Sequence, residues 1–198
     1  MSAVVCVCLL LSTTPALAGV GPMDLLKQRN NEVEHLLKQK VAPATAEERK
    51  QKNALKTLAA TLLNYQELGK RALAQHWEKL SNKQHDDFIR TFRELLERNY
   101  LRQMGGSVNY SIKYLDEKIE ANEATVTTEM RVKTAGKPTD ADVVYKLSRV
   151  GAKWMVYDII TDEVSLLRNY RSQFHKIIAE KSFDELIKKM RAKLAETD

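Results

Sequence analysis

Apolar positions along the chain change their spacing twice. Between Pro22 and Tyr100 they recur every three or four residues, the spacing that lines one face of an α-helix. Over residues 108–160 apolar and polar residues alternate, as in strands with one buried face. Over residues 163–194 the helical spacing returns. Helices followed by strands and again by helices predict an α+β domain.

Capping boxes mark several helix starts. In this motif a Ser, Thr or Asn is followed three residues later by Glu or Gln, and the two side chains satisfy free N–H groups at the helix end. Thr45, Asn64, Ser81 and Ser182 each have such a partner. We therefore predict helices beginning near these four residues, an earlier one beginning at Pro22, and a further one over 163–181.

The alternating segments lie at 108–114, 124–132, 143–147 and 154–160, with turn residues between them at 136–138 and at Gly151. They predict an antiparallel sheet of about four strands in a meander. One face of this sheet is apolar, so we expect the amphipathic helices to cover it.

The first 18 residues differ from the rest of the chain. Residues 3–11 are apolar and uncharged, and the small-x-small sequence Ala16-Leu17-Ala18 follows them. This pattern predicts a secretory signal cleaved after Ala18, leaving residues 19–198 as a single domain; the alternative is a buried core strand. Cys6 and Cys8 lie in the removed segment. A mature chain without cysteine suits an oxidising compartment such as the periplasm.

The charge balance is basic: 32 Lys and Arg against 26 Asp and Glu give +6. An excess of this sign favours anionic surfaces, including phospholipid headgroups. Charges of both signs are interspersed without a basic block, so the sequence gives no strong indication of nucleic-acid binding. An evenly mixed, solvated surface is the alternative.

Catalytic and metal-binding patterns are not found in the sequence. The histidines His35, His76, His85 and His175 are not spaced three or four apart, so no helical zinc pair is formed within one element. Carboxylates occur in pairs, but solvation in a loop and capping of the following helix by Asp162 explain them. We expect neither an enzyme nor a bound cofactor or metal.

Arg171 is the polar residue whose position is most unusual. At 100° per residue it lies at the edge of the apolar stripe formed by Leu167, Phe174 and Ile178. A guanidinium there needs an anion. Two partners remain open: a structural carboxylate, Asp158 or Asp162, or the phosphate of a ligand.

Two regions resemble a known family. The segment from Trp154 to Ile159, with the N-Y-R-S-Q-F run at 169–174, is similar to the signature of the MlaC family, the toluene-tolerance periplasmic phospholipid-binding proteins. A second likeness runs through the segment 68–77 and the apolar stripe of the following helix, from Phe88 to Tyr100. The resemblance covers roughly residues 22–194.

The resemblance implies a monomeric shuttle that carries phospholipid between an outer-membrane lipoprotein complex and an inner-membrane ABC transporter subunit, and so maintains outer-membrane lipid asymmetry. We expect the acyl chains of the carried phospholipid to lie between the helices and the apolar face of the sheet. The candidate lining residues share an apolar face or its edge: Tyr65, Leu68, Trp77, Phe88, Phe92, Leu95, Leu96, Tyr100, Tyr110, Val126, Met130, Tyr145, Val156, Val164, Leu167, Tyr170, Arg171, Phe174 and Ile178. Two alternatives stay open, an enzyme on an NTF2-like or cystatin-like fold and a protein-binding adaptor with a packed core.

The chain departs from the family pattern at three positions. The family usually has Gly where this chain has Ala74 and Glu163, and Asp where Asn64 stands. Asn caps a helix as well as Asp does. Glu163 is expected to affect the turn between the last strand and the next helix.

Overall fold

The computed structural model describes residues 20–104, 109–133 and 139–196. The predicted signal segment lies outside this part of the chain. In chain order the elements are α1 (Pro22–Lys38), α2 (Ala46–Leu62), α3 (Tyr65–Leu73), the 3-10 helix η1 (Ala74–Lys79), α4 (Asn82–Met104), β1 (Asn109–Glu120), β2 (Glu123–Lys133), β3 (Thr139–Val150), β4 (Lys153–Thr161), β5 (Val164–Ser165), α5 (Leu166–Glu180) and α6 (Phe183–Ala195).

The strands form one antiparallel sheet in the order β1-β2-β3-β4-β5, so each strand pairs with its neighbours in the chain. The predicted α+β fold with an antiparallel meander is confirmed. A short fifth strand, β5, is added where the sequence pattern predicted the start of a helix.

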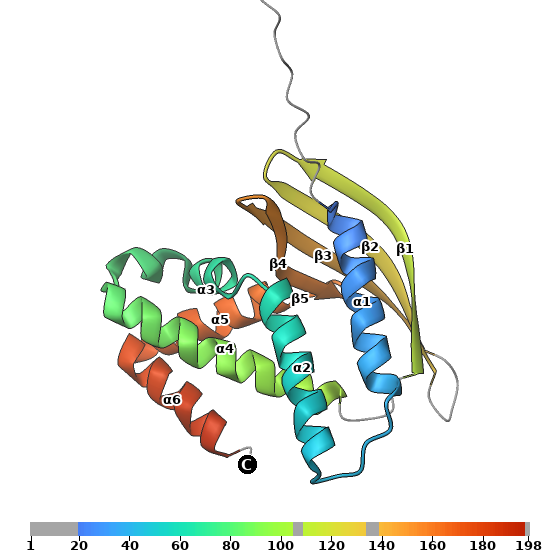
Figure 1. Ribbon diagram of the computed structural model, residues 1–198. Coiled ribbons are helices and arrows are strands. Elements are labelled where there is room, and N and C mark those ends of the chain that lie inside the picture. Colours follow the sequence, from blue (N-terminus) through green and yellow to red (C-terminus); the bar gives the residue numbers. More distant parts are fainter. Residues whose placement is uncertain (1–19, 105–108, 134–138, 197–198) are drawn as a thin grey trace, which may run out of the picture.

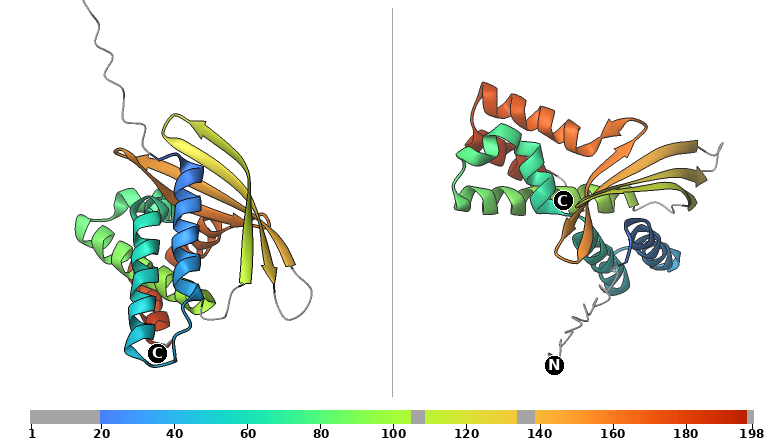
Figure 2. Two further views of the ribbon diagram at one scale, coloured as in Figure 1. Left: turned by 45° about the vertical axis from the view of Figure 1, so that its right-hand side comes forward. Right: turned by 90° about the horizontal axis from the view of Figure 1, so that it is seen from above.

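The helices are divided between two places. Helices α1 and α2 lie side by side across one face of the sheet, whereas α3, α4, α5 and α6 gather beyond its β4 edge (Figures 1 and 2). The polypeptide passes from one group to the other at Leu63, which bridges to Val156 of β4, and at Asn64, whose N–H donates to the Val156 carbonyl at 2.7 Å. The end of α2 and the start of α3 are therefore fixed to the sheet.

The predicted helix starts are confirmed at all four capping boxes. The side chains of Thr45, Asn64 and Ser182 each accept a hydrogen bond from the N–H three residues on, and Ser81 forms three with Gln84. Local hydrogen bonds of this kind need no tertiary contact, which is why sequence can predict them.

The start of α5 differs from the prediction. The helix begins at Leu166 instead of residue 163, because Val164 and Ser165 continue the sheet and Ser165 caps the helix by accepting from the Arg168 N–H. The expectation that Asp162 caps this helix is wrong. Its Oδ1 instead accepts a hydrogen bond from the N–H of Asp142, on the neighbouring strand β3, at 3.0 Å.

Two separate hydrophobic cores result. The helical cluster joins α3, α4, α5 and α6 to Tyr157 of β4. Its buried members are Tyr65, Leu68, Ala72, Leu73, Phe88, Ile89, Phe92, Leu95, Leu96, Tyr157, Leu167, Phe174, Leu186, Ile187 and Met190. The sheet cluster lies under α1 and the end of α2, and its buried members are Leu26, Ala124, Val126, Leu147, Trp154 and Val156.

Charged groups fasten the helical cluster to the sheet. Arg71 of α3 pairs with Glu67 on its own helix and with Glu123 of β2, each at 2.6 Å, and its guanidinium lies 4.0 Å from the centre of the Tyr157 ring. The hydrogen bond from Arg71 lowers the pKa of Glu123 below its usual value. The pair therefore stays ionised at neutral pH and ties α3 to both β2 and β4.

Candidate functional site

The apolar face of the sheet is closed at one end and partly open at the other. Ala124, Val126, Leu147 and Val156 lie at the closed end and are at most 3% exposed, because α1 and the end of α2 cover them. Toward the opposite end the same face continues through half-buried apolar side chains. We call these the open end; they are Tyr110, Ile112, Met130, Val132 and Ala141.

Strand pairing brings the open end together. Ile112 of β1 lies opposite Met130 of β2, which lies opposite Ala141 of β3, and Tyr110 lies opposite Val132. Side chains on alternate positions point to one face of a sheet, so these five form one continuous apolar surface. A half-buried surface of this kind is not the centre of a packed core, and it is suited to an apolar ligand.

Polar contacts hold α1 along the β1 side of this surface. The Tyr110 hydroxyl donates to Asn30 Oδ1 at 2.9 Å, and Lys27 Nζ lies 5.5 Å from the centre of the Tyr114 ring. Burial, with a smaller contribution from Glu34, raises the pKa of Tyr114 to about 12, so its hydroxyl stays neutral. Helix α1 is thus attached at its edge by a few polar groups.

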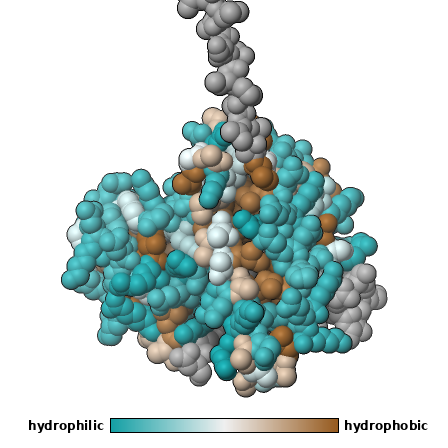
Figure 3. Space-filling model, in the orientation of Figure 1, coloured by the Kyte–Doolittle hydropathy of each residue, from teal (hydrophilic) through white to brown (hydrophobic). Residues whose placement is uncertain are grey.

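The seam between α1 and α2 forms the other boundary of this apolar surface. At the lower end of the two helices, Gln51 Nε2 donates to the Leu36 carbonyl at 2.6 Å and to the Gln39 carbonyl at 2.9 Å. Hydrophobic surface gathers along this seam in the space-filling view (Figure 3). Apolar side chains are therefore exposed along the seam between α1 and α2.

Most of the residues predicted as ligand-lining lie in the helical cluster instead. Phe92 shows how closely they pack: it has no exposed surface, and its ring centre lies 4.8 Å from that of Tyr170 and 5.3 Å from that of Phe174. Buried in this cluster, or packed against it, are Tyr65, Leu68, Trp77, Phe88, Phe92, Leu95, Leu96, Leu167, Tyr170, Phe174 and Ile178. Their assignment to a ligand pocket stays a prediction.

The other predicted residues are scattered. Val126 and Val156 belong to the sheet cluster, with Tyr145 packed against it, and Tyr110 and Met130 lie at the open end. Val164 is 64% exposed, because it stands on β5 at the sheet edge. The side chain of Tyr100 lies outside the part of the chain that the structure describes.

Arg171 pairs with neither Asp158 nor Asp162, the two expected carboxylates. Its side chain is exposed, and its Nε donates to the Arg71 carbonyl at 2.9 Å. The Asp158 carboxylate is engaged elsewhere: it accepts from the Ser165 hydroxyl at 2.7 Å and from the Leu167 N–H at 2.9 Å. Arg171 therefore joins α5 to the end of α3, while Asp158 stabilises the first turn of α5.

Four residues near this surface were not among those predicted from the sequence to line a ligand site. Ile112 and Tyr114 share the alternation that selected Tyr110, so the period of two could have found them. Leu26 and Val33 of α1 are buried on the side of that helix that faces the interior, and their spacing of seven was the available signal. These four residues lie near the same surface only because α1 packs against the sheet.

The fold also brings together two histidines that are far apart in the sequence. His76 Nε2 of η1 lies 3.0 Å from His175 Nδ1 of α5. Desolvation, with His175 and Lys79 nearby, lowers the pKa of His76 below its usual value. Within the described ranges, no three His, Cys, Asp or Glu side chains are grouped so as to hold a metal ion.

None of the described helices is both long enough and apolar enough to span a bilayer.

Comparison with known proteins identifies the family. The model of the MlaC protein family matches residues 27–192, which is most of the chain. This chain belongs to the MlaC family.

One curated MlaC relative is the intermembrane phospholipid transport system binding protein MlaC of Haemophilus influenzae. It is 24% identical over 186 residues, covering 91% of this chain and 85% of the relative. Among solved structures, the phospholipid-binding protein of Ralstonia solanacearum, determined in complex with a phospholipid, has a TM-score of 0.69 at 18% identity. The match covers 87% of this chain and 96% of that one, so the two share a fold.

Two of the departures from the MlaC pattern fall on unusual backbone. Ala74, at the junction of α3 and η1, has φ 47° and ψ −122°, and Glu163, in the turn between β4 and β5, has φ 67°. Glycine adopts such positive φ values without steric cost, whereas other residues are strained there. At both positions the backbone therefore has a conformation that suits the glycine usual in the family, although this chain has Ala and Glu there.

Proposed function

We propose that this protein is a lipid carrier that binds one phospholipid, with the acyl chains against the open end of the sheet face, and moves it between two membranes. Membership of the MlaC family carries this proposal. The name of the Haemophilus relative and the phospholipid in the Ralstonia structure support it.

The energetics of lipid transfer explain why a carrier needs such a surface. A buried methylene is worth about 0.8 kcal/mol, so a lipid with roughly 30 of them meets a barrier of about 24 kcal/mol when it leaves a bilayer unaided. A carrier lowers this barrier by offering apolar surface in place of water. The open end of the sheet face and the seam between α1 and α2 supply it without any catalytic group.

The compartment and partners follow from the same proposal. A carrier between two membranes works in the aqueous space between them, which agrees with export to the periplasm through the segment 1–18. Transient docking to an outer-membrane lipoprotein complex and to an inner-membrane lipid-binding transporter subunit completes the route. The net charge of +6 suits approach to anionic membrane surfaces.

The two alternative functions receive less support. An enzyme would place an ionisable group such as Asp158 or His76 in a cleft, yet Asp158 caps α5 and His76 is paired with His175. An adaptor with a fully packed core would bury the whole sheet face, yet the open end is only half-buried.

Native mass spectrometry of the purified protein, followed by lipid extraction, tests the proposal. We expect a one-to-one complex with phospholipid, and uptake of phospholipid from vesicles by protein that has been stripped of lipid. A stripped, folded protein that takes up no lipid would refute the carrier function.

A further inference from the structure

A charged residue interrupts the buried stripe of α1. Pro22, Leu26 and Val33 are the buried residues of this helix. Arg29 lies three residues after Leu26 and four before Val33, so it projects from the same side of the helix. Its side chain is only 26% exposed. An arginine in such a position is expected to have its donors fully engaged.

The N–H groups of Arg29 are only partly hydrogen-bonded. Arg29 Nη1 contacts Glu32 Oε2 at 2.7 Å, one turn further along α1. Arg29 Nε is enclosed and has no hydrogen-bond partner, and it is the only side-chain nitrogen or oxygen in this condition among the described residues. A buried donor without an acceptor is destabilising, so such a group calls for an explanation.

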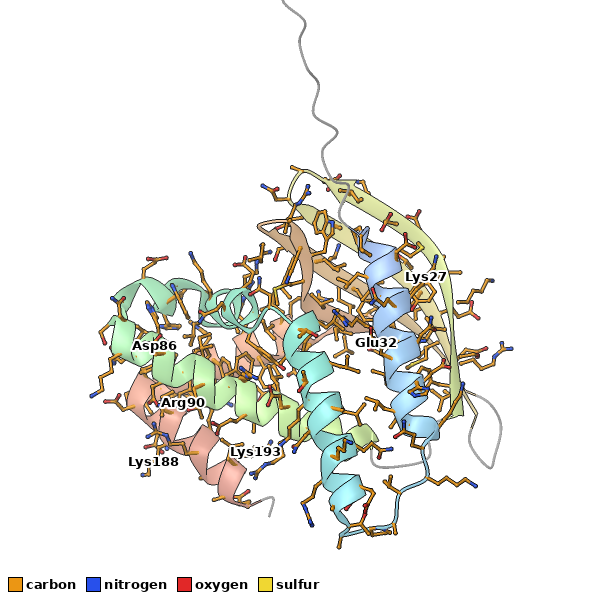
Figure 4. The ribbon with its side chains drawn as sticks, in the orientation of Figure 1. Lys27, Glu32, Asp86, Arg90, Lys188 and Lys193 are labelled. Carbon is orange, nitrogen blue, oxygen red and sulfur yellow. The ribbon has the colours of Figure 1, made fainter. Side chains whose placement is uncertain are left out.

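The group lies at the seam between α1 and α2. Figure 4 shows Glu32 on the side of α1 that faces α2, and Lys27 on the other side, toward β1. The two helices run in opposite directions, and Gln51 of α2 is level with Leu36 of α1. At 1.5 Å per residue, Leu58 of α2 is then level with Arg29. Leu58 is apolar, so its side chain offers no acceptor to the guanidinium at this height.

From this geometry we infer that Arg29 binds the phosphate of the carried phospholipid. Glu32 binds Nη1, whereas Nε and Nη2, which form the other edge of the guanidinium, have no hydrogen-bond partner among the described residues. That edge presents two parallel N–H groups, which match two phosphate oxygens in the bidentate arrangement typical of arginine. The inference rests on the proposed function and adds to it a headgroup site at the seam between α1 and α2.

The test compares two lipids with the same acyl chains, one with a phosphate and one without. Lipid-stripped wild-type and Arg29→Met proteins are incubated with vesicles containing phosphatidylglycerol or diacylglycerol, and bound lipid is counted by native mass spectrometry. We expect Arg29→Met to lower phosphatidylglycerol binding about tenfold or more, the size of one lost charged hydrogen bond, and to leave diacylglycerol binding unchanged. The lipid-free variant should be at least as stable as the wild type, since an unsatisfied donor has been removed.

Lys38→Met is the matched control, because Lys38 lies on the same helix and its exposed side chain pairs with Glu34, away from Arg29. It should bind both lipids as the wild type does. Arg29→Lys, which keeps the charge but loses the two-pronged edge, should recover only part of the phosphatidylglycerol binding.

The outcomes separate the two proposals. Equal binding of phosphatidylglycerol by wild type and Arg29→Met, or an equal loss for both lipids, would overturn the role of Arg29 while leaving the carrier function standing. A wild-type protein that binds neither lipid would refute the carrier function itself. Displacement of bound phosphatidylglycerol by millimolar inorganic phosphate would overturn the assignment to a lipid headgroup and point to a free phosphate ion.

Discussion

The helical cluster and the open end of the sheet face are both apolar, yet they differ in how completely they are packed. In the helical cluster Phe88 and Phe92 have no exposed surface and stack with their neighbours. At the open end Ile112 and Met130 also belong to an apolar surface, but they remain half-buried.

This difference separates a structural core from a surface that can take a ligand. Most of the aromatic residues that the sequence predicted as ligand-lining instead pack between the four helices α3, α4, α5 and α6. The half-buried surface is built of ordinary alternating residues on β1, β2 and β3. Apolar content alone therefore does not distinguish a core from a candidate lipid surface, whereas the degree of burial does.

The largest expected effect tests the packed side of this comparison. Phe92→Ala should lower the free energy of unfolding by about 3–5 kcal/mol, because it leaves a cavity among three aromatic rings. Ile112→Ala, at the open end, should cost about 1 kcal/mol, since the side chain is only half-buried. Urea denaturation of both variants measures this, and equal losses would show that the open end is as tightly packed as the helical cluster.

The second effect is on binding. Met130→Asp places a charge on the open end and should reduce phospholipid uptake from vesicles at least tenfold, because a carboxylate is poorly solvated beside acyl chains. Thr127→Asp, on the opposite face of the same strand, is the control and should bind normally. If the two variants took up lipid equally well, the acyl chains would not lie on this face.

A third prediction concerns the strained junction within the helical group. Ala74→Gly should raise the free energy of unfolding by about 1–2 kcal/mol, because the backbone there has φ 47°. Ala54→Gly, in the interior of α2, should instead lower it by about 1 kcal/mol through loss of helix propensity. The opposite signs distinguish local strain from a general effect of glycine, and loss of stability in Ala74→Gly would contradict the strain.

The smallest effect depends on pH and reports on the contact between η1 and α5. The pKa of His76 is lowered in the folded state, so the neutral form is favoured there. The associated stability is complete above the unfolded-state pKa of about 6.5 and is lost as the pH falls through the folded-state pKa. We expect the melting temperature to fall less between pH 7.5 and 5.5 in His76→Gln than in the wild type; an identical fall would assign the pH dependence to other groups.

The local features of the fold could be predicted from sequence because their causes are local. Thr45, Asn64, Ser81 and Ser182 mark helix starts through hydrogen bonds that span three residues. The start of α5 was misplaced because Val164 and Ser165 pair with β4, a contact that no periodicity within the helix reveals.

The candidate site was predictable only in part. The alternation on β1 and β2 correctly placed Tyr110 and Met130 on the apolar face, but pattern alone could not show which apolar residues would be left half-buried. The expected carboxylate partner of Arg171 was not found, because its exposed side chain reaches a backbone carbonyl on α3. The unsatisfied nitrogen of Arg29 had no signal in the sequence at all.

The sequence by itself determined the α+β class, the order helices–sheet–helices, four of the helix caps and the family, since each of these rests on periodicity or motifs along the chain. The tertiary structure decided which apolar face was closed and which was left open. Burial depends on where α1, α2 and the α3–α6 group come to rest against the sheet, and that placement is set by contacts between residues far apart in the chain, such as Asn64 with Val156 and Arg71 with Glu123.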